Sequence, residues 1–160
     1  MPETLYIIDA FAQIFRAYYA IRGGMISPVT SEPTHVTFGV TAMLIKMFRE
    51  MKPHYVIVAA DAPGPTFRDE IYAEYKATRS PTPDDLISQI PRVFEVFDYF
   101  GIPTISRRGL EADDVIASVV ERITRDHPEV EIRIVSKDKD LEQLLGPKVT
   151  MYDIHTETTI

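Results

Sequence analysis

Short apolar runs alternate along this chain with longer segments of helical periodicity, and this alternation limits the folds open to it. The runs that read as buried strands are 5–8, 55–60, 102–105, 132–135 and 149–152. The segments with helical periodicity are 11–21, 34–51, 84–100 and 110–126. Strands that alternate with helices favour an α/β fold in three layers, with a mainly parallel central sheet and helices on both of its faces.

The size and composition of the chain restrict its organisation and its chemistry. A length of 160 residues suits a single domain. With no cysteine, the chain can form neither a disulfide nor a thiolate zinc site, so any metal would need oxygen or imidazole ligands. The N-terminus has no signal-peptide pattern, and no apolar run approaches the roughly 20 residues that span a bilayer. We therefore expect a cytoplasmic protein with no membrane partner.

Each of three expected strands runs directly, or within three residues, into an aspartate, and the third is followed by a second aspartate two residues later. These aspartates are Asp9, Asp61, Asp138 and Asp140. The carboxyl ends of parallel strands share one edge of the sheet, where ligands bind, so these aspartates should converge. A second acidic group opens the last expected helix at the same edge, and it consists of Glu111, Asp113 and Asp114.

Each of these acidic residues also has a purely structural interpretation. Acidic residues are favoured in the first turn of a helix, where they cap it and complement its dipole, which suits Glu111, Asp113 and Asp114. An aspartate after a strand often forms a turn, and Asp138 could simply cap a following helix. Each interpretation can account for its own residue. Together they explain less well why all seven acidic residues gather at one edge of the sheet.

Seven carboxylates at one edge would repel one another unless protons or cations neutralise them. Oxygen ligands suit Mg²⁺ or Mn²⁺, and two such ions about 4 Å apart would hold the attacking and leaving oxygens of a phosphodiester in line. The net charge of −7 argues at first against a nucleic-acid partner. Setting the seven aside leaves 17 acidic residues against 17 Lys and Arg, so the rest of the chain is formally neutral.

Several motifs of the chain match one known family in order. They are Ile8-Asp9 with Phe15-Arg16-Ala17-Tyr18, Asp61-Ala62 with Thr66-Phe67-Arg68-Asp69-Glu70, Tyr75-Lys76 with Arg79 to Leu86, Gly109 to Ile116, and Ser136 to Asp140. With these motifs the chain resembles the N-terminal, PIN-like part of the 5'-3' exonuclease domain of bacterial DNA polymerase I, in the flap endonuclease superfamily.

The resemblance implies a role for each matched residue. The metal-site carboxylates would be Asp9, Asp61, Glu111, Asp113, Asp114, Asp138 and Asp140. Lys76 and Arg79 would start a helical arch and contact the scissile phosphate, with Arg16 and Arg68 as supporting phosphate contacts. Tyr72 and Tyr75 could stack on an unpaired base. The implied reaction is hydrolysis of DNA phosphodiesters at 5' ends or flaps, as in DNA replication and repair, with two Mg²⁺ or Mn²⁺ ions.

The chain departs from the family pattern at several points. Ala10 and Lys137 stand where the family commonly has glycine, and Asp153 matches no family ligand and is interpreted as a turn residue. We expect one domain over residues 1–160, cut before a helix-hairpin-helix region that carries two more metal-site aspartates in the family. RNA primers as a substrate and a polymerase domain in the same parent chain stay open.

Two other functions remain possible for the sequence. A truncated chain could bind metal and DNA without turnover. A Rossmann-like Mg²⁺ phosphohydrolase would also use aspartates at strand ends, but it would not account for the segment from Tyr75 to Asp85.

Overall fold

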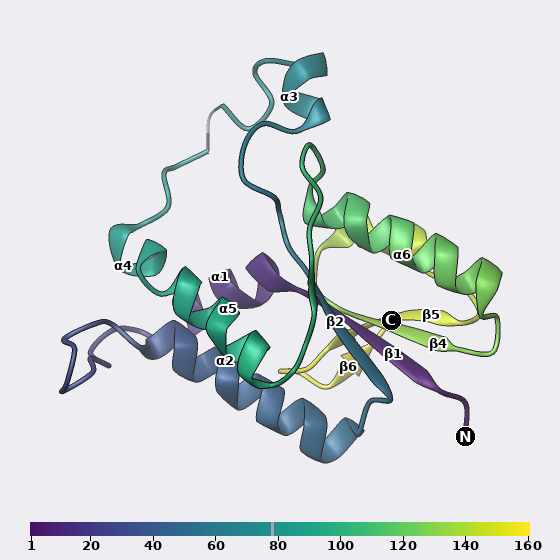
Figure 1. The fold of residues 1–160 in the computed structure, drawn as a ribbon, viewed down its shortest axis with the longest axis horizontal. Helices are drawn as coiled ribbons and strands as arrows, with labels where there is room; N and C mark the ends of the chain where they lie inside the picture. The colour runs from purple at the N-terminus through teal and green to yellow at the C-terminus, as the bar shows by residue number, and fades with distance from the viewer. Residues whose placement is uncertain (78) are drawn as a thin grey trace.

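The computed structural model describes residues 1–77 and 79–160 (Figure 1). Its strands form one sheet in the order β3-β2-β1-β4-β5-β6. Their bounds are β1 Thr4–Asp9, β2 Tyr55–Ala59, β3 Thr104–Ile105, β4 Glu131–Val135, β5 Val149–Asp153 and β6 Thr158–Thr159. Strands β1 to β5 pair in parallel, and β6 pairs antiparallel with β5. The predicted mainly parallel sheet is confirmed.

Helices cover both faces of this sheet (Figure 1). Their bounds are α1 Ala10–Ala20, α2 His35–Lys46, the π-helix η1 Met47–Met51, α3 Phe67–Ile71, α4 Asp84–Ile87, α5 Ile90–Tyr99, α6 Ala112–Asp126 and the 3-10 helix η2 Lys139–Leu144. Within the described ranges, none of them combines the length and the apolar character that crossing a bilayer requires.

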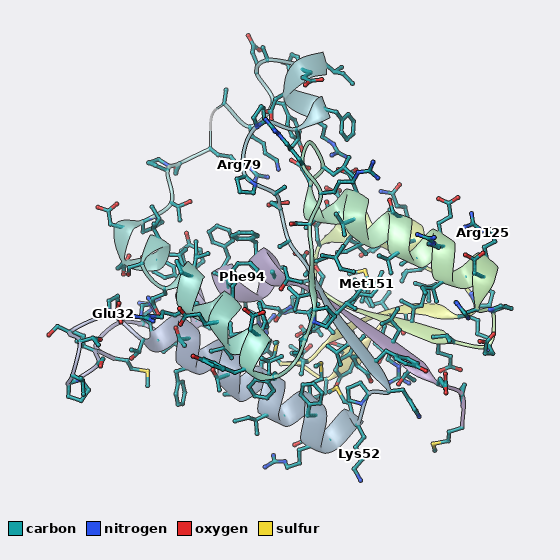
Figure 2. All side chains as sticks on the ribbon, in the orientation of Figure 1. Glu32, Lys52, Arg79, Phe94, Arg125 and Met151 are labelled. Carbon is teal, nitrogen blue, oxygen red and sulfur yellow. The ribbon has the colours of Figure 1, made fainter. Side chains whose placement is uncertain are left out.

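Alternation along β1 divides the core into two parts. Tyr6 and Ile8 point to one face, where they join the buried side chains of α1, α2 and α5. Leu5 and Ile7 point to the other face, against α6. Burying each such side chain contributes roughly 1.5–3 kcal/mol. On the first face Phe94 of α5 lies beside α1, with its ring 6.1 Å from that of Phe11 (Figure 2). The three-layer prediction is therefore confirmed.

Two sequence predictions about elements need correction, and one helix was missed. The helix expected over 84–100 is two helices, α4 and α5, because Pro91 has no N–H to donate to a preceding turn and its ring would clash with the carbonyl four residues earlier. The short helix α3, closed by a capping box between Thr66 and Asp69, was not expected. The strand expected over 102–105 is only the two-residue β3.

The register of the central strands aligns their carboxyl ends. Ile8 of β1 pairs with Val135 of β4, and Asp9 pairs with Ala59 of β2. Helix α6 begins at the same end of the sheet, and α3 with the connection that follows it stands beyond this end (Figure 1). The fold therefore brings the residues after β1, β2 and β4 together with the first turn of α6.

Candidate metal centre

Asp9 and Asp61 are held at the carboxyl ends of β1 and β2. Asp9 caps α1, where its carboxylate accepts a hydrogen bond from the N–H of Ala12 at 3.5 Å, and its side chain is buried. The hydroxyl of Ser136 donates to its other oxygen at 3.1 Å. Asp61 accepts the N–H of Ala112 at 2.6 Å, which links the end of β2 to the start of α6. Both carboxylates are thus oriented by the backbone around the edge of the sheet.

Three further carboxylates converge beside them. Oxygen atoms of Asp113, Asp138 and Asp140 all lie within 4.8 Å of one another. Asp113 comes from the first turn of α6, while Asp138 and Asp140 open η2 after β4. The carboxylate of Asp138 also accepts the N–H of Asp140 at 2.9 Å, so the cap interpretation holds for Asp138 as well. Closely spaced carboxylate oxygens with no sulfur or imidazole fit a hard divalent cation such as Mg²⁺ or Mn²⁺.

The electrostatics of these five carboxylates, which we call the inner group, favour a bound cation. Burial raises the pKa of Asp9 from 3.8 to about 6, and the charges of Asp113 and Asp61 add to the rise. Burial, followed by the charge of Asp138, also raises the pKa of Asp113. In residues 1–77 and 79–160 no Lys, Arg or His forms an ion pair with an inner carboxylate. The repulsion among them is therefore left for another cation to offset.

Glu111 and Asp114, the outer pair, are already neutralised by the protein. Arg68 binds Asp114 through two nitrogens at 2.7 and 2.9 Å, and it lies 3.2 Å from Glu111. Lys76 forms an ion pair with Glu111, and the hydroxyl of Tyr75 donates to the same carboxylate at 3.3 Å. The hydrogen bonds from Arg68 lower the pKa of Asp114. The outer pair thus holds α3 and the turn after it against the start of α6.

A pocket of about 370 Å³ lies between the two groups. Its lining includes Arg68 and Tyr75, both carboxylates of the outer pair, and Asp113 and Asp140 of the inner group. The same pocket thus offers a guanidinium, an aromatic ring and carboxylates, so a phosphate held there would contact groups of both charges.

Residues 4–160 match the model of the 5'-3' exonuclease N-terminal resolvase-like domain. The chain belongs to this family. It is 37% identical over 147 residues to the 5'-3' exonuclease of Aquifex aeolicus, covering 92% of this chain and 50% of that protein. It is 40% identical over 148 residues to DNA polymerase I of Deinococcus radiodurans, covering 92% of this chain and 15% of that one. The chain therefore spans half or less of these relatives.

Solved nuclease structures share the fold of this resolvase-like domain. The T5 D15 protein co-crystallised with metal ions aligns with a TM-score of 0.74 and 21% identity, over 98% of this chain and 57% of that one. The catalytic core of Rad2 in complex with DNA substrate aligns with a TM-score of 0.56 and 17% identity, over 99% and 46% of the two chains. The predicted PIN-like, resolvase-like class is confirmed by these alignments and by the family match.

In this exonuclease-family domain the predicted phosphate-contacting cations lie in different places. Arg68 and Lys76 bind the outer pair, and Arg68 also lines the pocket. Arg16 lies 3.5 Å from Asp153, and Lys137 binds the same carboxylate at 2.7 Å. Asp153 also accepts the N–H groups of His155 and Thr156, so it is a turn residue as predicted.

The expected start of a helical arch is not formed in the described part of the segment between α3 and α4. Lys76 lies in a turn and has a left-handed φ of 60°. A right-handed α-helix cannot continue through a residue in this conformation. Arg79 is exposed on the connection to α4 (Figure 2). Tyr72 is exposed, with its hydroxyl on Glu74 at 2.9 Å, whereas Tyr75 is half-buried at the pocket.

Sequence reasoning missed two buried polar residues beside the inner group. Ser136 appeared only as the first residue of a motif, yet its hydroxyl contacts both Asp9 and the backbone of Asp138. Gln13 of α1 donates to the carbonyl of Val135 at 3.1 Å. The available signals were a small hydroxyl directly after a buried strand and a glutamine on the apolar face of a helix.

Proposed function

We propose that this domain is the metal-binding part of a divalent-metal-dependent 5' nuclease acting on DNA with 5' ends or flaps. The observation that carries the proposal is the convergence of Asp113, Asp138 and Asp140 within 4.8 Å, beside the buried Asp9. Membership of the 5'-3' exonuclease family supports this activity, as do relatives that include a 5'-3' exonuclease and DNA polymerases I. The metal ligands proposed are the seven carboxylates predicted from the sequence, with the inner group as the principal site.

Mg²⁺ or Mn²⁺ held here would supply a water nucleophile and offset charge on the phosphate, and two ions are proposed. The protein's own residues would do the rest. The inner group would hold the cations at a fixed place, and Asp61 would tie that place to α6 through Ala112. Lys76, Arg79 and Arg68 would bind the phosphate from the side of α3, with Arg16 as a more distant contact. Tyr72 and Tyr75 would stack against an unpaired base.

Cleavage of a 5'-flap DNA duplex by the 160-residue chain with Mn²⁺ tests this proposal. We expect cleavage that needs the metal, is lost in Asp113→Asn, and is retained in Asp98→Asn, which removes an exposed carboxylate on α5 that belongs to neither acidic group. No cleavage by the wild-type chain, with Mn²⁺ and DNA both bound, would contradict turnover. It would favour the alternative of a binding module, which is a real candidate because the chain spans half or less of its relatives.

Several finer points remain predictions. A following helix-hairpin-helix region with two more aspartates, and a polymerase domain in the same protein, can be checked in the reading frame beyond Ile160. Cleavage of an RNA-primed strand beside the DNA flap would decide whether primers are substrates. A cytoplasmic location would be checked by cell fractionation.

A further inference from the structure

Ser136 lies at the junction of β1 and β4, which lead into three of the five inner carboxylates. It follows β4 directly and is only 2% exposed. Ile8 pairs with Val135 in the parallel β1–β4 ladder, so the residues that come next, Asp9 and Ser136, lie side by side at the carboxyl edge. The register of two strands therefore sets this contact.

The single hydroxyl of Ser136 makes two hydrogen bonds that join separate parts of the site. It donates to Asp9 at 3.1 Å, and it accepts the N–H of Asp138 at 3.1 Å. A serine hydroxyl has one hydrogen to donate, and here Asp9 receives it. The orientation of the Asp9 carboxylate and the path of the loop to Asp138 and Asp140 are thus fixed by the same atom.

Gln13 reinforces the same junction from α1. It is 6% exposed, lies one helical turn after Asp9, and donates to the carbonyl of Val135 at 3.1 Å. Two buried side chains therefore tie the start of α1 to the end of β4, immediately before the loop that bears Asp138. Buried hydrogen bonds of this kind are costly to break, so they restrict the relative position of the segments they join.

We infer that Ser136 is a positioning residue of the metal centre, which sets the distance and orientation of the Asp9 carboxylate relative to Asp138. The inference rests on the proposed metal-dependent function. Ser136 itself is neither a metal ligand nor a group that touches the substrate. It acts through Asp9 and Asp138, the two acidic residues that it contacts. Partners that orient metal ligands typically change metal affinity when they are removed.

The test measures Mn²⁺ affinity by isothermal titration calorimetry on the 160-residue chain, with thermal unfolding in a metal chelator as a separate measure of folding. We expect Ser136→Ala to bind Mn²⁺ about 10-fold more weakly than wild type at a temperature where both are folded. Ser136→Thr keeps the hydroxyl and should recover most of the affinity. Ser118→Ala, which removes a hydroxyl bonded to a backbone carbonyl of α6, is the matched control and should bind as wild type.

A second variant keeps the test decisive if Ser136→Ala does not fold. Ser136→Cys fills the same space with a poor hydrogen-bonding group and should show a similar loss of affinity. Mn²⁺ affinity within about twofold of wild type in a folded Ser136→Ala or Ser136→Cys would overturn the inference. A Ser136→Thr affinity as low as that of Ser136→Ala would also overturn it. If the wild-type chain itself binds no Mn²⁺, the proposed function fails, which is a different result from unchanged affinity in the variants.

Discussion

The inner group and the outer pair both consist of carboxylates, yet their electrostatic surroundings are opposite. Asp113 and Asp114 are consecutive on α6. The pKa of Asp113 is raised by burial and by neighbouring carboxylates, whereas that of Asp114 is lowered by Arg68. Among the residues that the structure describes, Arg68 and Lys76 therefore neutralise the outer pair alone. The unneutralised inner group is where a metal would replace repulsion with attraction.

This difference suggests separate tasks within one acidic edge. The outer pair binds Arg68, Tyr75 and Lys76 and so holds this segment against the start of α6, where Arg68 and Tyr75 line the pocket. Backbone N–H groups orient three inner carboxylates, those of Asp9, Asp61 and Asp138, and satisfy only part of each, which leaves further oxygen sites available. Capping and metal binding are thus compatible roles for the same residue.

The largest expected effect compares the two neighbouring aspartates. Asp113→Asn should weaken Mn²⁺ binding by more than about 100-fold, because a ligand should matter more than an orienting partner, and Asp114→Asn by less than about 10-fold. Titration calorimetry on both variants measures the difference. Equal losses would show that the outer pair belongs to the metal site as fully as the inner group.

A second prediction concerns the pH dependence of stability without metal. The folded-state pKa of Asp9 is about 6 and its ordinary value is 3.8, so the folded state favours the protonated form. The free energy of unfolding should therefore rise as the pH falls from about 7 to about 4, with up to roughly 3 kcal/mol from Asp9. Urea unfolding at a series of pH values measures it.

Asp9→Asn is the informative variant for this pH effect. It should be more stable than wild type at pH 7 in a chelator and should show a smaller gain on acidification. Asp98→Asn, with an exposed carboxylate, should keep the wild-type slope. If the free energy of unfolding of Asp9→Asn depended on pH as steeply as that of wild type, the buried Asp9 carboxylate would not be the group that destabilises the metal-free chain at neutral pH.

The smallest expected effect lies in the outer pair. Arg68→Met should destabilise the chain by about 1 kcal/mol, since the ion pair with Asp114 is partly exposed and screened by solvent. In a double-mutant cycle with Asp114→Asn the two changes should be non-additive by a similar amount, measured by urea unfolding. Additive effects would indicate that the two side chains do not interact in solution.

Much of this fold could be predicted because the signals are local. The apolar runs at 5–8, 55–60 and 132–135 correspond to β1, β2 and β4, although β2 is buried only at its carboxyl end. The aspartates that follow these strands lie at one edge because parallel strands end together. The break between α4 and α5 also had a local signal, which is Pro91 in the first turn of α5. The signal was missed because helical periodicity continues on both sides of the break, and because a proline near the start of a helix is well tolerated.

The division of the acidic edge could not be predicted in the same way. Arg68 and Lys76 reach the outer pair only because α3 and its turn fold back across more than 30 residues of sequence. The contact between Ser136 and Asp9 spans 127 positions and depends on the exact register of β1 and β4. Periodicity in the sequence indicates which face of a helix or strand a residue occupies. It does not show with which Lys or Arg a carboxylate forms an ion pair.

The most direct test of the inner group as a metal centre is an anomalous difference map from a crystal of the chain soaked in Mn²⁺. We expect a peak among the carboxylate oxygens of Asp113, Asp138 and Asp140, with the ion pairs of Arg68 and Asp114 still in place. A peak only between Glu111 and Asp114, with Arg68 displaced, would contradict the account. So would the absence of any peak at the carboxyl edge of the sheet.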